Sequence, residues 1–274
     1  MMHLLYPNNP LRPRQPDEQI AAELDAVRAA GFEVSLFSME SLQAGEFRPV
    51  PPLPSTISVL YRGWMLSAAE YGSLVSFLVQ AGARPVISAE DYLASHHLPN
   101  WYPLIFDLTP ETRVFPSDCD LETELRALAW PEYFIKDYVK SLKTSVGSRI
   151  SKPEQVSAVV ADMHRFRGVI EGGFCVRRVE SFLPDTERRY FVLDGVAHAA
   201  SGDVPPIVHE CAKRLRSRFY SVDVVQRTEG QLRIVEVGDG QVPDLVGSTP
   251  KQFAAILAQS TFYFDTKGLP IHIA

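Results

Sequence analysis

The sequence predicts two structural classes in one chain: an α/β domain over residues 1–110 and an α+β portion after it. Strands and helices alternate over the first part, which is typical of a mostly parallel sheet covered on both faces. After about residue 130 strands follow one another directly, which favours antiparallel pairing. The length of 274 residues is enough for two or three closely packed lobes.

The composition excludes several classes of protein. Hydrophobic residues make up 46% and charged residues 22%, which is ordinary for a globular chain. The net charge of −6 argues against a general nucleic-acid binder, which needs clustered positive charge. No apolar run approaches the roughly 20 residues of a membrane helix, and the N-terminus lacks a secretory signal. We therefore expect a cytoplasmic protein with no nucleic-acid or membrane partner; the oligomeric state stays open, a homodimer included.

The first domain is built from four apolar runs. A helix over residues 16–30 is expected to stop at Gly31. Ser67 is followed by Glu70, a capping box that begins a second helix ending at Gly82. A proline-dense loop separates the second and third strands. The expected strands cover residues 2–7, 32–38, 55–63 and 84–88.

The second part contains six expected strands and three expected helices. Ser151 with Glu154 indicates another capping box, and valines from Val156 onward recur at helical spacing. Further helices are expected near residues 208–216 and 250–258. The expected strands cover residues 132–141, 145–150, 174–182, 187–195, 219–226 and 231–238.

Common functional motifs are missing. There is no GxGxxG after the first strand, no GxxxxGK[ST] and no GxSxG. The adjacent His96 and His97 would point to different faces of a helix, so we interpret them as a solvated or loop-packed pair. The three scattered cysteines are too few for a disulfide framework or a zinc site: Cys119, Cys175 and Cys211.

The most informative pattern is an acidic pair on the last predicted hairpin. A turn centred between Glu229 and Gly230 places Asp223 directly opposite Glu236, with both side chains on one face. Two carboxylates in that position repel each other, so a positive group should lie between them. Mg²⁺ is one choice, since it favours one or two carboxylates plus phosphate oxygens. The alternatives are a solvated face, neutralisation by Arg233 or another arginine, or a one-residue slip that separates the pair.

Lys136 lies within the apolar strand FIKDYV, where burial is costly unless an anion meets the ammonium group. Residues 140–148 follow as a loop of small and cationic residues, whose hydroxyl, N–H and ammonium groups could wrap a polyphosphate. A solvated hairpin turn is the alternative for this loop.

The stretch 180–192 is typical of an extended linker that could stack an adenine ring. In it, Glu187 could accept hydrogen bonds from ribose hydroxyls and Arg189 could reach a phosphate. Alternatively, Arg188 and Arg189 pair with acids on the surface.

The order of these features resembles the ATP-grasp superfamily, in particular its small bacterial and phage families. The resemblance rests on motifs from about residue 130 to 240. It implies a Rossmann-like N-terminal domain over residues 1–110, followed by a two-lobed ATP-grasp fold. The small ATP-binding lobe would span residues 111–183 and the C-terminal lobe residues 184–274, with ATP between them.

The family's functional positions fall on residues already singled out, and their roles here are what the resemblance implies. Lys136 matches the strand lysine that holds a phosphate of ATP. The implied phosphate-loop ligands are Lys143, Thr144 and Ser145. The implied adenine and ribose ligands are Glu180, Phe182, Leu183 and Glu187. The implied magnesium ligands are Asp223 and Glu236.

Two positions depart from the family pattern. The strand lysine is often followed by proline, whereas Asp137 follows it here. The closing Glu-x-Asn motif is replaced by Glu236-Val-Gly238, and glycine has no side chain to ligate a metal. Asp239 is the candidate substitute ligand, although a regular strand would place it on the other face unless a bulge intervenes.

The resemblance implies an ATP-dependent carboxylate–amine or carboxylate–thiol ligase that works through an acylphosphate. Arg189 would steady the transferred group. Arg62, at the carboxyl end of a predicted parallel strand, could bind the carboxylate of a small-molecule, amino-acid or peptide substrate; an arginine paired with a surface acid is the alternative. A small-molecule kinase and a nucleotide-binding protein without turnover remain open alternatives.

Overall fold

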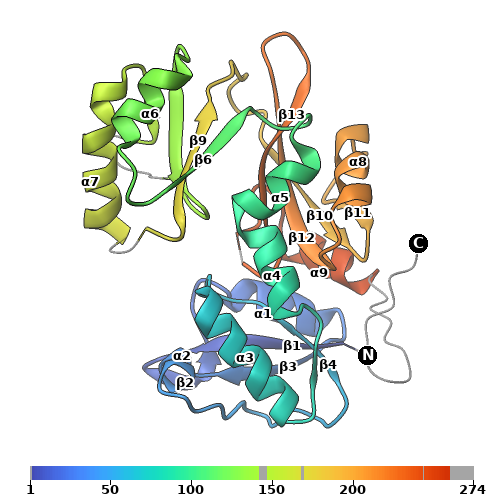
Figure 1. Ribbon diagram of the computed structural model, residues 1–274. Coiled ribbons are helices and arrows are strands. Elements are labelled where there is room, and N and C mark those ends of the chain that lie inside the picture. The colour runs from blue at the N-terminus through green and yellow to red at the C-terminus, as the bar shows by residue number, and fades with distance from the viewer. Residues whose placement is uncertain (1, 142–146, 168–169, 243, 260–274) are drawn as a thin grey trace.

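The computed structural model describes residues 2–141, 147–167, 170–242 and 244–259. Three sheets form its framework, and each has helices packed on it (Figure 1). The first sheet forms the N-terminal domain, the second the small lobe and the third the C-terminal lobe. Within the described residues, no helix combines the length and apolar character needed to cross a membrane.

The N-terminal domain is a parallel sheet around β1 (Met2–Asn9). β1 pairs in parallel with β3 (Glu33–Phe37) on one side and β4 (Ser58–Tyr61) on the other, and β5 (Arg84–Pro85) continues beyond β4. The description of this domain as Rossmann-like stays a prediction. The helices of the domain are α1 (Ala21–Ala29), α2 (Met39–Gln43) and α3 (Ala68–Gln80).

The first helix begins later than predicted. Residues 12–16, which precede it, form β2 (Arg12–Pro16), and this strand pairs antiparallel with the end of β1. The capping box before α3 is confirmed: the backbone N–H of Glu70 donates to Ser67 Oγ, and the Ser67 N–H donates to the Glu70 carboxylate. This cap fixes the loop that precedes α3.

The small lobe is an antiparallel sheet in the order β6–β9–β7–β8, covered by α6 (Leu121–Leu128) and α7 (Val156–Arg167). The sequence analysis missed α6 and β6. The cap before α7 also differs from the expectation, because Gln155 rather than Glu154 accepts from the Ser151 N–H. The strands are β6 (Thr112–Pro116), β7 (Tyr133–Asp137), β8 (Arg149–Ile150) and β9 (Gly173–Arg178), and a 3₁₀ helix covers Pro153–Gln155.

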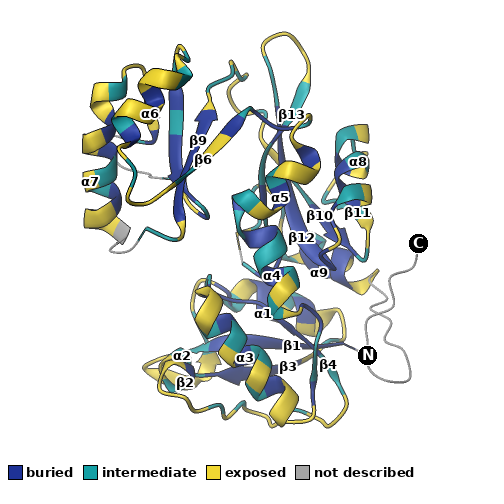
Figure 2. Ribbon diagram, in the orientation of Figure 1, coloured by how far each residue is buried: buried dark blue, intermediate teal, exposed yellow. Residues whose placement is uncertain are grey.

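The C-terminal lobe is an antiparallel sheet in the order β11–β10–β12–β13. Buried residues of its core are shared with α5 (Leu98–Ile105) and α8 (Pro206–Arg214), and strands of all three sheets are the most buried elements (Figure 2). The other elements are α4 (Ala89–His96), β10 (Arg188–Leu193), β11 (Val196–Ala199), β12 (Phe219–Gln226), β13 (Leu232–Asp239) and α9 (Pro250–Ala258).

The C-terminal lobe and the N-terminal domain share a core. Phe253 and Leu257 of α9 are buried among the apolar residues of the first sheet, and α9 packs against α1. Conversely, Trp101 of α5 belongs to the core of the C-terminal lobe although it precedes residue 110. The packing therefore joins these two parts firmly, and the domain boundaries at residues 110 and 183 stay predictions.

Candidate active site

The predicted acidic pair is confirmed by the strand register. Asp223 of β12 lies directly opposite Glu236 of β13. The register nearer the turn is shifted by one residue, because Val224 pairs with Ile234 and Val235 is left without a strand partner as a β-bulge. The bulge restores the expected pairing beyond it, so both carboxylates lie on one face of the sheet.

Arg189 extends this pair into a row across three strands. It lies opposite Asp223 on β10, so Arg189, Asp223 and Glu236 follow one another across β10, β12 and β13. Its guanidinium donates to both carboxylate oxygens of Asp223, at 2.7 and 2.6 Å, and to the carbonyl oxygen of Asp244 at 2.6 Å. Burial raises the pKa of Asp223, and the Arg189 hydrogen bonds act against that rise. An internal arginine therefore meets one carboxylate of the pair.

Lys136 reaches the row from the small lobe. It lies on β7, its side chain is buried, and its Nζ is 3.9 Å from Glu236 Oε1. The sequence argument that a buried strand lysine needs an anion is thus met by Glu236. Glu236 itself keeps 45% of its side chain exposed, so it faces open space as well as Lys136.

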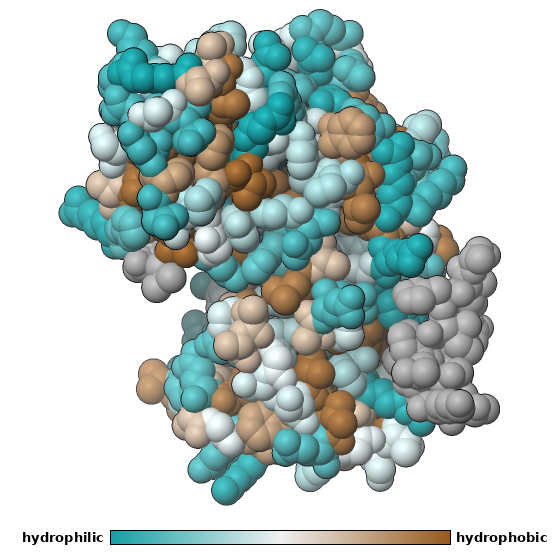
Figure 3. Space-filling view, in the orientation of Figure 1, coloured by the Kyte–Doolittle hydropathy of each residue, from teal (hydrophilic) through white to brown (hydrophobic). Residues whose placement is uncertain are grey.

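A cleft of about 1190 Å³ lies in front of the row. All three parts of the chain line it, and the surface is hollowed between the small lobe and the N-terminal domain (Figure 3). The C-terminal lobe supplies Arg189, Ser221 and the strand end 236–239, the small lobe supplies Val139–Ser141, Phe166 and Glu171, and the first 100 residues supply Gln19, Trp64–Ser67 and His96.

Arg62 does not offer its guanidinium to this cleft, so the expectation of a substrate-binding arginine is wrong. The side chain is 0% exposed, and it forms a two-bond pair with the Glu23 carboxylate of α1. Its remaining donors bond the carbonyl oxygens of Gly240 and Val242, just after β13. A buried guanidinium needs partners for its donors, and Glu23 and the chain after β13 supply them.

Asp239 does not join the other two acids. No bulge lies between Glu236 and Asp239, so Asp239 points to the opposite face, where Gln241 Nε2 donates to its carboxylate at 3.1 Å. Burial raises its pKa to about 7. Across the described residues, no group of three or more acidic, histidine or cysteine side chains is arranged to hold a metal ion. The expected third metal ligand is therefore missing from the row.

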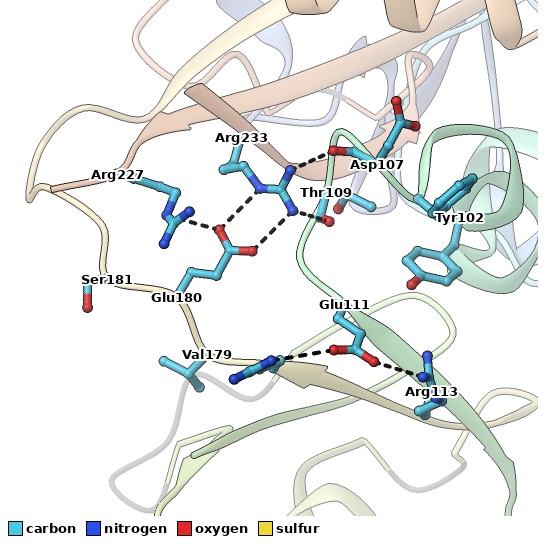
Figure 4. A pocket seen from close by; sticks show the side chains of 12 residues that line it. Tyr102, Asp107, Thr109, Glu111, Arg113, Val179, Glu180, Ser181, Arg227 and Arg233 are labelled. Carbon is cyan, nitrogen blue, oxygen red and sulfur yellow. Dashed lines mark hydrogen bonds and ion pairs between the residues drawn. The ribbon is translucent and has the colours of Figure 1, made fainter. Parts of the chain in front are cut away.

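The predicted adenine linker lies at the hinge between the two lobes rather than in the cleft. The Arg233 guanidinium holds both oxygens of Glu180 and also bonds the carbonyl oxygens of Asp107 and Thr109 (Figure 4). Arg233 therefore ties both connections of the small lobe to β13. Leu183 donates its N–H to the carbonyl oxygen of Gln226, at 2.8 Å.

The other linker residues add less to the site. Phe182 forms a bridge with Arg227, and Glu187 is exposed just before β10. The predicted phosphate-loop residues Lys143, Thr144 and Ser145 lie outside the described residues.

Two features of the cleft were missed from the sequence. The loop Trp64–Ser67 lines it, and the capping box at Ser67 after a parallel strand was the available signal. His96 also lines the cleft, stacked on Tyr92 with ring centroids 4.6 Å apart. Burial lowers the pKa of His96 to about 4, so its imidazole is neutral at pH 7. Its position depends on the packing of α4, which no local pattern reveals.

Comparison with known proteins gives a consistent family. A family model described as an ATP-grasp domain, the third family of its clade, matches residues 89–257. No relative among the curated proteins matches the sequence.

Solved structures share the fold at low sequence identity. The D-cycloserine synthetase DcsG has a TM-score of 0.62 and 14% identity, over 94% of this chain and 98% of that one. The D-alanine–D-alanine ligase from Coxiella burnetii has a TM-score of 0.61 and 12% identity, over 93% and 90%. A RimK domain ATP-grasp protein from Sphaerobacter thermophilus DSM 20745 has 0.61 and 18%, over 93% and 98%. These likenesses establish the fold.

Proposed function

Because this chain belongs to the ATP-grasp superfamily, we propose that it is an ATP-dependent ligase that joins a carboxylate to an amine or a thiol. The observation that carries the proposal is the row Arg189–Asp223–Glu236, which faces Lys136 across a cleft. Fixed charges of both signs at one cleft are what phosphoryl transfer requires, since catalysis there is positioning and charge stabilisation.

The proposed reaction has two steps. A carboxylate oxygen of the first substrate attacks the γ-phosphorus of ATP, the bond from that phosphorus to the bridging oxygen breaks, and ADP leaves. The amine nitrogen or thiol sulfur of the second substrate then attacks the acyl carbon, releasing phosphate and losing a proton. A cleft of about 1190 Å³ is larger than most single-ligand pockets, which agrees with several reactants held together.

The residues around the cleft take complementary roles in this proposal. Lys136 holds an α- or β-phosphate, and Arg189, fixed by Asp223, faces the transferred group. Lys140 lines the cleft where the phosphate loop begins, and the loop residues Lys143, Thr144 and Ser145 would continue it. In the linker, Glu180, Phe182 and Leu183 would hold adenine and Glu187 the ribose.

The acid row fits one magnesium ion. Glu236 presents a half-exposed carboxylate to the cleft, and Mg²⁺ is usually held by one or two carboxylates plus substrate phosphates. When bound, such an ion neutralises charge that develops on the phosphate oxygens. A second ion does not fit the described residues, because Gly238 and Asp239 provide no further ligand on this face.

The acceptor substrates would enter beside the N-terminal domain. Trp64–Ser67, His96 and Glu171 line that end of the cleft. The solved structures of similar fold include a D-alanine–D-alanine ligase and the ATP-grasp ligase PsnB in complex with a precursor peptide. We accordingly propose an amino acid, another small molecule or a peptide as substrate.

The proposal is tested by incubating the protein with ATP, Mg²⁺ and a mixed pool of amino acids and short peptides. We expect ADP release only when a carboxylate and an amine or thiol are both present, with the ligated product seen by mass spectrometry. A phosphorylated alcohol would instead identify a kinase. Failure to bind Mg·ATP in calorimetry would overturn the proposal as a whole.

A further inference from the structure

The two acids of the row differ in what they offer to a metal ion. Both oxygens of Asp223 accept hydrogen bonds from Arg189, and the side chain is only 2% exposed. Glu236 makes no side-chain hydrogen bond to any described residue, and its ion pair with Lys136 is 3.9 Å long. One carboxylate of the pair is therefore committed within the protein, and the other is open to the cleft.

The place of a third ligand is filled rather than empty. Gly238 lies opposite Ser221, whose hydroxyl donates to the Gly238 carbonyl oxygen at 3.4 Å. A Cβ atom built at Gly238 would lie 3.1 Å from Ser221 Oγ, closer than ordinary contact distance. A side chain at position 238 would thus press on Ser221, and the glycine suits the local packing of the row.

The arginine supplies a permanent positive charge where the two acids would otherwise repel. A guanidinium stays protonated at every physiological pH, and its two parallel N–H groups match a carboxylate. The contact with the Asp244 carbonyl oxygen adds a third anchor, so the guanidinium is held from two sides. A second divalent ion at Asp223 would have to displace this fork and would lie beside its charge.

We infer that this site takes a single divalent cation with each nucleotide, held by Glu236, and that the Arg189 guanidinium, anchored by Asp223, stands in the place of a second cation. The inference rests on the proposed function, since the nucleotide supplies the other ligands. Asp223 is then an anchor for Arg189 and not a metal ligand.

Counting bound metal tests this inference directly. The full chain is titrated with Mn²⁺ in the presence of one equivalent of a non-hydrolysable ATP analogue, and bound ions are counted from the loss of the aqueous Mn²⁺ signal in electron paramagnetic resonance. We expect one ion per chain. Two ions per wild-type chain would overturn the inference but leave the proposed ligase intact, whereas absence of analogue binding would overturn both.

Variants sharpen the count. Arg189→Gln exposes Asp223 opposite Glu236 without a positive partner, so we expect the count to rise from one to two. Arg188→Gln is the matched control, because Arg188 is exposed and its hydrogen bonds go to neighbouring carbonyl oxygens, and it should stay at one. Glu236→Gln should lower Mn²⁺ affinity at least about 10-fold, and a count of one in Arg189→Gln would contradict the substitution of arginine for metal. If Arg189→Gln does not fold, the wild-type count still decides.

Discussion

Replacing Arg62 tests whether it supports the fold or binds a substrate. Its guanidinium is fully buried and meets Glu23, while two carbonyl oxygens after β13 take its other donors. Arg62→Ala would leave the Glu23 carboxylate buried beside the Tyr6 hydroxyl, which donates to it at 2.9 Å. Breaking one partner of a buried ion pair costs about 3–5 kcal/mol, so we expect the free energy of unfolding to fall by about that amount.

Equilibrium urea unfolding followed by tryptophan fluorescence measures this loss. Arg48→Ala is the control, because Arg48 is 83% exposed and pairs with Glu46 at the surface, and a surface pair contributes about 0–1 kcal/mol. Replacing both partners, as in Arg62→Met with Glu23→Leu, should recover much of the loss, since no buried charge then stays unpaired. If Arg62→Ala unfolds like wild type but binds its carboxylate substrate more weakly, the structural role assigned to Arg62 is refuted.

Three further predictions concern the site and its supports. Lys136→Ala should weaken Mg·ATP binding about 10-fold in calorimetry, since a hydrogen bond to a charged group contributes about 1.5–3 kcal/mol; the exposed Lys152→Ala is its control, and equal affinities would remove Lys136 from the site. Arg233→Gln should speed hydrogen exchange at residues 107–109 and 179–181 by releasing both hinge connections, and unchanged exchange would contradict that. Because burial raises the pKa of Asp239 from 3.8 to about 7, the folded state holds its proton more tightly than the unfolded chain. Stability should therefore fall as pH rises from about 4 to 7, and Asp239→Asn should flatten that fall in urea midpoints; parallel profiles would argue against it.

The acidic pair was predictable because hairpin pairing depends on local spacing alone. The positions of the turn residues sufficed to oppose Asp223 and Glu236, even though the bulge at Val235 was not foreseen. The same symmetry does not extend to a third strand, so the pairing of Arg189 with Asp223 could be raised only as one arginine among several that could neutralise an acid.

Arg62 shows the limit of prediction from sequence. A strand-end arginine near a sheet edge fits a ligand role, but its partner Glu23 comes from another element 39 positions away. The β6 strand and α6 helix were missed for a related reason: both are short, and they are stabilised by packing against β9 and the small-lobe core rather than by a strong local pattern.

A crystal structure of the chain with Mg²⁺ and a non-hydrolysable ATP analogue tests the central claim most directly. We predict the β- and γ-phosphates between Glu236 and Lys136, with the Arg189 fork still on Asp223. A triphosphate bound elsewhere, such as beside Arg113 and Arg178 behind the hinge, would contradict the assignment of the acid row as the active site.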